Sequence, residues 1–260
     1  MRENAVKAAL ARGEVQVGTW LHTLGMPQTI QVLATAGFDF VYIDMEHSAF
    51  SIETVAGMCA AGLHAGIVPL VRPTAHEFHL VSRPLDNGAL GVLMPHVDTG
   101  EDAAAAVRSA LFVPDGDRGS QPTSNHMDFA AVDVAEHMRR FNEECLVIVQ
   151  IESRIALDNL DAILATPGVD GATVGRGDLA IDLGHPGERD HPEVTQAVHD
   201  TIAACRRHGK APALLVFDPD DAATWIKAGV RMVAYSSELV LLREAARSAL
   251  ADVRRIRPTE

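Results

Sequence analysis

Lysine is scarce in this sequence. The chain has 260 residues, and only three of its 22 basic residues are lysines: Lys7, Lys210 and Lys227. Enzymes that form a Schiff base with a carbonyl substrate, or with pyridoxal phosphate, need a lysine that faces the active site. Two of these lysines precede predicted strands and the third ends a predicted helix, so none is placed for that chemistry. The composition therefore argues against a Schiff-base enzyme.

Cysteine is also scarce, and long apolar runs are absent. The three cysteines, Cys59, Cys145 and Cys205, are far apart and form no Cys-x-x-Cys pair, which argues against a disulfide framework or a structural zinc site. No run of 18 apolar residues occurs, and the N-terminal segment MRENAVKAALARGE has no apolar core. We therefore expect no membrane span and no signal peptide, and a cytoplasmic protein with buried thiols.

The chain is acidic but otherwise ordinary in composition. A formal net charge of −13 argues against a nucleic-acid or anionic-membrane partner, because phosphate groups are held by clustered Lys and Arg. Apolar residues make up 47 % of the chain and charged residues 22 %, which is typical of a soluble globular protein. We therefore expect a folded protein that acts on small molecules.

Short apolar segments alternate with longer segments of helical periodicity. Strands are predicted at Val17–Leu21, Phe38–Asp44, Ile67–Arg72, Gly91–Pro95, Leu146–Glu152, Gly171–Gly175, Ala213–Phe217 and Arg231–Tyr235. Helices are predicted at Thr29–Ala36, Glu53–Ala65, Ala103–Ala110, Leu157–Ala165, Val194–His208, Asp220–Ala228 and Leu239–Val253. Eight strand–helix repeats predict an α/β fold, a single-domain (β/α)₈ TIM barrel over residues 1–260. A doubly wound sheet is the alternative, which the lack of Gly-x-Gly-x-x-Gly after the first strand disfavours.

In such a barrel, functional side chains gather at the carboxyl ends of the strands. The residues at or just beyond those ends are Trp20, Asp44, Glu46, His47, Arg72, His96, Gln150, Glu152, Asp178, Leu215 and Ser236. Two long connections, Val113–Asp128 and Asp182–Pro192, leave the same face. We expect the active site there, because a purely structural barrel would not need charged groups converging from several strands.

The carboxylates Glu152 and Asp178 indicate a site for a hard divalent cation such as Mg²⁺ or Mn²⁺. They follow neighbouring predicted strands, and their positions in the sequence do not require either of them to pair with a basic residue. The alternative is structural: Glu152 would pair with Arg154, and Asp178 would cap the following helix. Spacing alone leaves both interpretations open.

Other strand-end residues fit acid–base chemistry and anion binding. His47 is a candidate general base, although a surface histidine is the commoner case. Arg72 ends an apolar strand and must meet either a carboxylate or a substrate oxyanion. The backbone of Gly175–Gly177 could bind a carboxylate at a strand-to-helix turn, a weak signal by itself.

These residues together resemble the class II, metal-dependent pyruvate aldolases of the phosphoenolpyruvate/pyruvate barrel superfamily, whose type member cleaves 4-hydroxy-2-oxo-heptane-1,7-dioate. The resemblance extends over nearly the whole chain. The motifs that carry it are Asp44-x-Glu46-His47, Val71-Arg72-Pro73, Leu85-Asp86-x-Gly88-Ala89, Gln150-x-Glu152 and Gly175-x-x-Asp178-Leu179.

The resemblance implies a role for each matching residue. Glu152 and Asp178 would bind the metal, Mg²⁺, Mn²⁺ or Co²⁺. His47 would be the base, acting through a water molecule on the metal, with Asp86 orienting it, and Arg72 would stabilise the enolate oxygen. Asp44 and Glu46 would support these groups from behind. Gln150, Gly175, Arg176 and Gly177 would bind pyruvate, and Trp20 and Leu215 would shape the aldehyde pocket. Family members are commonly hexamers, trimers of dimers, in which the last helix is exchanged between neighbours.

The chain departs from the family pattern around the acceptor. Arg176 stands where the family usually has proline, His22 where glycine is frequent, and the segment Arg118–His126 differs from the usual loop. The resemblance implies an aldolase that cleaves 4-hydroxy-2-oxo acids to pyruvate and an aldehyde. The departures keep open an oxaloacetate decarboxylase or a related carbon–carbon lyase or condensing enzyme. A non-catalytic binding barrel is disfavoured, because every matching position is filled.

Overall fold

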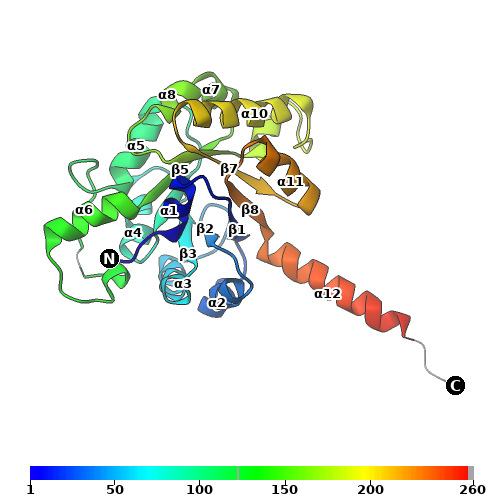
Figure 1. Cartoon of the computed structure of the whole chain (residues 1–260), viewed down its shortest axis with the longest axis horizontal. Coiled ribbons are helices and arrows are strands. Elements are labelled where there is room, and N and C mark those ends of the chain that lie inside the picture. Colours follow the sequence, from blue (N-terminus) through cyan, green and yellow to red (C-terminus); the bar gives the residue numbers. More distant parts are fainter. Residues whose placement is uncertain (122, 257–260) are drawn as a thin grey trace.

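The computed structural model describes residues 1–121 and 123–256 and contains a closed barrel of eight parallel strands, each paired with the next in sequence (Figure 1). The strands are β1 Gln16–Leu21, β2 Phe40–Asp44, β3 Val68–Arg72, β4 Gly91–Met94, β5 Leu146–Ile151, β6 Gly171–Val174, β7 Ala211–Val216 and β8 Met232–Ser237. All eight predicted strands are confirmed, and their ends shift by no more than two residues. The TIM barrel predicted from the strand–helix alternation is therefore confirmed, and the doubly wound alternative is wrong.

Helices surround the barrel and connect its strands. They are α1 Ala5–Ala11, α2 Pro27–Thr35, α3 Ile52–Ala65, α4 Phe78–Asp86, α5 Gly100–Ala110, α6 Val134–Glu144, α7 Arg154–Asp158, α8 Leu160–Leu164, α9 Arg176–Asp182, α10 Pro192–Arg207, α11 Pro219–Ala228 and α12 Glu238–Arg255, with a 3₁₀ turn η1 at Asn125–Met127. The predicted helix Leu157–Ala165 is divided at Asn159, which caps both halves. Pro122 of the predicted loop Arg118–His126, and residues 257–260 of the predicted domain, lie outside the described residues.

Local chemistry explains where several helices begin and end. Thr99 and Asp102 form a reciprocal capping box at α5, and Asp218 caps α11 ahead of the proline at its first position. Gly66 ends α3 in the left-handed region, with φ 79°. A residue with a Cβ is strained there, which is why glycine closes this helix.

The core has two layers, one inside the barrel and one between strands and helices. Alternate strand residues point to opposite sides, so aromatic rings such as Phe40 and Tyr42 fill the barrel interior while the other residues pack against helices. Cys59, Cys145 and Cys205 are buried and free, as predicted. Burial raises the pKa of the Cys145 and Cys205 thiols to about 12, so these cysteines are unreactive.

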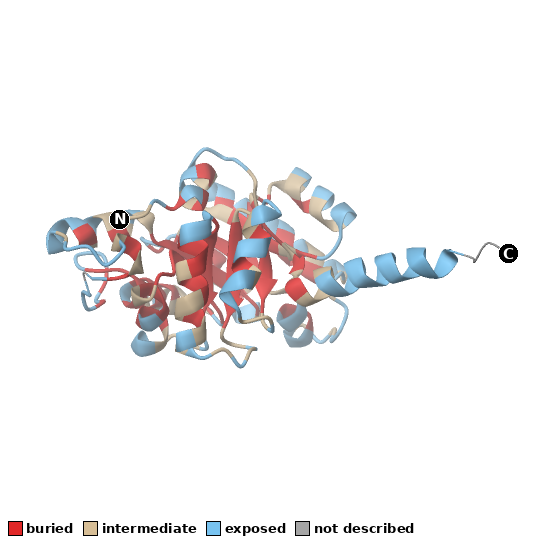
Figure 2. Ribbon diagram, turned by 90° about the horizontal axis from the view of Figure 1, so that it is seen from below, coloured by how far each residue is buried: buried red, intermediate tan, exposed pale blue. Residues whose placement is uncertain are grey.

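The last helix, α12, leaves the barrel and extends away from it (Figures 1 and 2). Among its residues only Glu238, at its start, is buried. Leu242, Leu250 and Val253 are exposed by 57 %, 47 % and 63 % of their surface. These apolar side chains of α12 are not covered by any other part of the described chain. No helix in the described part of the chain is long and apolar enough to cross a membrane.

Candidate active site

A cavity of about 410 Å³ opens at the carboxyl end of the barrel. It lies between the loops that follow β1, β2, β6, β7 and β8, the face where barrel enzymes place their active sites. Its lining includes Trp20, His22, Asp44, His47, Arg72, Gln150, Gly175, Arg176, Gly177, Asp178, Arg189, Leu215, Phe217 and Ser236. Most strand-end residues singled out in the sequence therefore meet at one cavity. Lysine is absent from this lining: Lys7 and Lys210 bond to Cys145 and Val169 at the opposite end of the barrel.

Glu152 is a buried carboxylate just beyond β5. It accepts a hydrogen bond from the amide of Gln150, and its Oε2 accepts one from the backbone N–H of His96 at 3.1 Å. Burial raises its pKa, and the nearby charges of Asp178 and Glu46 act in the same direction. The ion pair with Arg154 that formed the structural alternative is absent among the described residues, because Arg154 pairs with Glu193 instead. A buried carboxylate without a full cationic partner fits a divalent cation.

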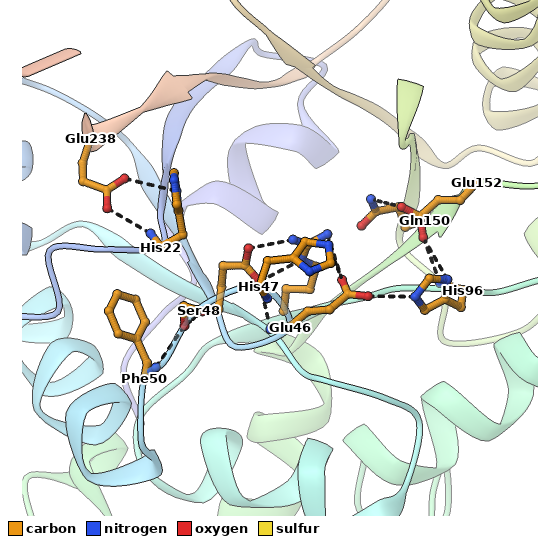
Figure 3. A network of polar contacts seen from close by, with 11 residues as sticks. His22, Glu46, His47, Ser48, Phe50, His96, Gln150, Glu152 and Glu238 are labelled. Carbon is orange, nitrogen blue, oxygen red and sulfur yellow. Dashed lines mark hydrogen bonds and ion pairs between the residues drawn. The ribbon is translucent and has the colours of Figure 1, made fainter. Parts of the chain in front are cut away.

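His96 contacts two residues of the site, although no motif assigned it a role. Its ring lies between two carboxylates, with Nε2 2.7 Å from Oε1 of Glu46 and Nδ1 3.5 Å from Oε2 of Glu152 (Figure 3). The backbone of His96 has φ 52°, a left-handed conformation that is unusual for a residue with a side chain. Its position at a strand end was the only sequence signal for this contact.

Arg72 is held rigidly at the end of β3. Its Nε and Nη2 bond to the two carboxylate oxygens of Asp44 at 3.0 and 2.6 Å, and its Nη1 lies 2.9 Å from Glu46. The guanidinium also stacks 4.5 Å from the ring centre of Trp20. Arg72 therefore pairs with carboxylates of the protein, which was one interpretation of the sequence. It also lines the cavity, where the other interpretation places a substrate oxyanion.

His47 and Asp86, expected to act as a pair, are separate in the described chain. His47 lines the cavity with an exposed ring, whose Nε2 lies 3.8 Å from Oε2 of Glu46. Asp86 ends α4 outside the cavity lining, and its Oδ1 accepts two hydrogen bonds from buried Arg118, at 3.2 and 2.6 Å. The structure does not bring Asp86 to His47, because Arg118 holds that carboxylate.

Arg176 lines the cavity, but other protein groups occupy its guanidinium. It bonds to both oxygens of Asp221, at 3.1 and 2.6 Å, to Asp190 at 3.2 Å and to the carbonyl of Leu215 at 2.9 Å. Burial acts to raise the pKa of Asp221, but the hydrogen bonds and charge of Arg176 lower it overall. The side chain predicted to bind pyruvate therefore connects the loops after β6 and β7.

Residues 16–245 match the HpcH/HpaI aldolase/citrate lyase family. The chain belongs to this family. It is 39 % identical over 249 residues to a 5-keto-4-deoxy-D-glucarate aldolase of Salmonella paratyphi C (strain RKS4594), with 96 % of each chain covered. The resemblance read from the motifs is confirmed, and the HpcH/HpaI member is a carbon–carbon lyase of the metal-dependent aldolase class.

Solved structures of similar proteins have the same fold. A family protein from Burkholderia cenocepacia J2315 is 37 % identical, with a TM-score of 0.90 over 96 % of this chain and 99 % of the other. The citrate synthase SbnG is 29 % identical, with a TM-score of 0.87 over 97 % of this chain and 98 % of the other. The fold therefore serves both aldol cleavage and condensation among its relatives.

The cavity of this HpcH/HpaI member contains buried polar atoms without partners. Oε1 of Gln150, Nε1 of Trp20 and Oγ of Ser236 have no hydrogen-bond partner among the described residues. All three residues line the cavity. Buried polar groups in native proteins are almost always bonded, so these atoms indicate a polar ligand.

Proposed function

We propose that the enzyme reversibly cleaves 4-hydroxy-2-oxo acids to pyruvate, or a related 2-oxo acid, and an aldehyde. One observation carries this proposal: Gln150 and Arg72 line the cavity, and the amide of Gln150 donates a hydrogen bond to the buried carboxylate of Glu152. A cation site beside an anion-stabilising arginine suits chemistry that builds negative charge on an oxygen.

Glu152 and Asp178 fit a divalent cation and would hold it. Glu152 is buried and lacks a lysine or arginine partner in the described chain, while Asp178 stands at the cavity edge where α9 begins. Oxygen donors of this kind suit Mg²⁺, Mn²⁺ or Co²⁺. When bound, such an ion supplies Lewis acidity toward a 2-oxo acid.

Arg72 would stabilise the oxygen that gains charge when the bond between C3 and C4 breaks. Its guanidinium is already fixed by Asp44, Glu46 and Trp20, so it needs no rearrangement as the charge develops. Gln150 would orient the 2-oxo acid through its amide N–H, which now donates a hydrogen bond to Glu152. The oxygen of the same amide has no partner among the described residues. The backbone of Gly175–Gly177, which lines the cavity, would bind the carboxylate.

His47 would take the proton from the 4-hydroxyl group as the aldehyde forms. The electron pair of the broken bond then moves into the 2-oxo group, and a proton at C3 completes pyruvate. The ring of His47 is at the cavity and keeps Nδ1 available, because its recorded ion-pair contact uses Nε2. Asp86 would orient this ring only after exchanging its bond to Arg118.

Pyruvate release from 4-hydroxy-2-oxo acids tests the proposal. We expect activity that requires added Mg²⁺, Mn²⁺ or Co²⁺ and stops with EDTA. Glu152→Gln should abolish it while the protein stays folded, because the neutral amide keeps the side-chain volume. Glu193→Gln, an exposed acid outside the cavity, is the matched control. Full, EDTA-insensitive activity in Glu152→Gln would refute the assignment.

Oxaloacetate decarboxylation or condensation is the second candidate. The likeness to a citrate synthase favours it, because the same end of the cavity could stabilise an enolate formed by loss of carbon dioxide. Consumption of oxaloacetate without any aldehyde would support this activity. Pyruvate release only from hydroxy-oxo acids would support the aldolase.

We further propose that the enzyme is a homo-oligomer in which α12 packs on a neighbouring copy. Support comes from the helix itself, which extends away from its barrel with exposed leucine and valine side chains (Figure 2). The family resemblance suggests a hexamer. Light scattering should give a mass several times that of the 27.8 kDa chain, and Leu242→Glu with Leu250→Glu should lower it. A monomeric wild-type mass would contradict this.

A further inference from the structure

Glu238 ties the start of α12 to the loop that follows β1. Its Oε1 accepts hydrogen bonds from three consecutive backbone N–H groups, those of His22, Thr23 and Leu24, at 3.0, 2.7 and 3.0 Å. Its Oε2 lies 3.4 Å from Nδ1 of His22. The carboxylate is buried, and the two residues lie 216 positions apart in sequence. This buried carboxylate fixes the loop, while Oε2, which has no hydrogen-bond partner among the described residues, lies beside the imidazole of His22.

The end of β8 is irregular where it meets this loop. Gly18 pairs with Ala234, but Trp20 pairs with Ser237, so β8 contains one residue more than β1 over the same stretch. The extra residue is accommodated at Ser236, whose φ of 56° is unusual for a residue with a side chain. Ser236 and Trp20 both line the cavity, each with a buried polar atom that lacks a partner.

His22 lies away from the proposed metal site. Figure 3 shows His22 and Glu238 on the opposite side of Glu46 and His47 from Glu152. A 2-oxo acid at Glu152 therefore leaves His22 to face the second substrate. The side chain is 35 % exposed, and with Nδ1 directed at Glu238 its Nε2 is the ring atom left for a ligand.

The cations near this part of the cavity are largely committed to protein partners. Arg176 bonds to Asp221 and Asp190. Arg189 stacks 4.1 Å from the ring centre of Phe217 and lies 3.4 Å from Asp190. Among the other polar groups that line the cavity are the imidazole of His22, the indole N–H of Trp20 and the hydroxyl of Ser236, which recognise a ligand by hydrogen bonds. A ligand hydroxyl can donate or accept, so it can bond Nε2 in either protonation state of the ring.

We propose that His22, positioned by Glu238, selects aldehydes that carry a hydroxyl group beside the carbonyl. This inference rests on the proposed function, because it assigns the second substrate of the same cavity. An alkyl aldehyde of equal length would leave Nε2 of His22 without a partner. Losing one such hydrogen bond changes selectivity by about 10- to 100-fold.

Glycolaldehyde and acetaldehyde, which differ by one hydroxyl group, are the matched probes. The measurement is kcat/KM for each aldehyde with pyruvate and Mg²⁺, and the ratio between them. His22→Ala should lower this ratio at least 10-fold relative to wild type, mainly through KM for glycolaldehyde. His22→Gln should restore part of it. Comparing ratios removes the intrinsic difference in reactivity between the two aldehydes.

Glu238→Gln tests the positioning role. The amide can still accept hydrogen bonds from the loop but no longer presents a carboxylate to Nδ1, so the same ratio should fall several-fold in a folded protein. His79→Ala, an exposed histidine on α4 outside the cavity lining, is the control and should keep the wild-type ratio. An unchanged ratio in His22→Ala overturns the inference, and so does a change of equal size in His79→Ala.

Exchange of the pyruvate methyl protons with D₂O separates the two levels of the proposal. This exchange needs the enolate but no aldehyde. If the wild-type enzyme exchanges these protons but its aldehyde ratio does not depend on His22, the proposed function stands and only the inference about His22 is wrong. If the enzyme with Mg²⁺ exchanges no protons and releases no pyruvate, the proposed function itself is wrong.

Discussion

Gly175 lies directly against Glu152. A Cβ atom on Gly175 would stand 2.7 Å from Cγ of Glu152 and 2.8 Å from Nε2 of Gln150, closer than side-chain atoms approach one another. The glycine therefore leaves the space in which the buried carboxylate and its amide partner lie. A residue without a side chain at the end of β6 thus determines where a candidate metal ligand can stand at the end of β5.

Gly175→Ala should weaken metal binding by about 10- to 100-fold, because Glu152 must move away from the added methyl group. Titration calorimetry with Mn²⁺ measures the change. Gly177→Ala is the matched control, since a Cβ there meets no atom within 4 Å, and its Mn²⁺ affinity should stay at the wild-type value. Equal affinities in the two variants would show that Glu152 does not hold the ion.

Arg176→Met should destabilise the fold by about 3 kcal/mol, because it leaves the carboxylate of Asp221 without its buried partner. Urea unfolding of each variant gives the free energy. In Arg176→Met with Asp221→Asn, much of the stability should return, since the uncompensated charge is gone. If Arg176→Met instead raised KM for pyruvate and left stability unchanged, Arg176 would be a substrate-binding residue, as the sequence predicts.

Arg72→Lys should lower kcat by about 100- to 1,000-fold, since lysine cannot bond both oxygens of Asp44 and also reach Glu46. Steady-state pyruvate release measures this. Arg139→Lys is the matched control on the surface of α6, where Arg139 makes a similar two-point contact with Glu136 in solvent. Its kcat should equal that of wild type. An active Arg72→Lys enzyme would mean that a point charge suffices.

His126 should make the fold sensitive to acid. Its Nε2 lies 2.8 Å from the carbonyl of Leu85, Nδ1 has no partner among the described residues, and burial lowers its pKa to about 4. The unfolded chain takes up a proton below pH 6.5, while the folded chain resists it until about pH 4. Stability is therefore complete above pH 6.5 and declines as the pH falls, with a loss of about 3 kcal/mol once it is below 4.

The acid sensitivity of His126→Gln tests this account, because glutamine can keep the N–H donor and does not titrate. Urea unfolding at pH 7 and pH 4.5 should give a smaller difference in free energy for the variant than for wild type. His137 nearby also has its pKa lowered by burial, so part of the slope should remain. Identical slopes in both proteins would assign the acid sensitivity to other groups.

Sequence patterns predicted the barrel because strands and helix caps depend on residues that are close together in the chain. Apolar runs bounded by glycine and polar residues located all eight strands, and cap chemistry located the starts of α5 and α11. The same patterns missed α1, which has only seven residues, and α6, in which only His137 and Phe141 are buried. The polar residues at strand ends were enough to indicate the cavity.

The scarcity of lysine and the identity of the strand-end residues were therefore readable without a structure. Which partners those residues choose was decided only by the fold. Arg176 meets Asp221 across 45 positions, Asp86 meets Arg118 across 32, and Glu238 meets the loop at His22 across 216. The closed barrel brings such distant segments into contact, and a buried charge then pairs with whichever opposite charge the packing places beside it. Residues that are close together in the sequence do not determine these pairings.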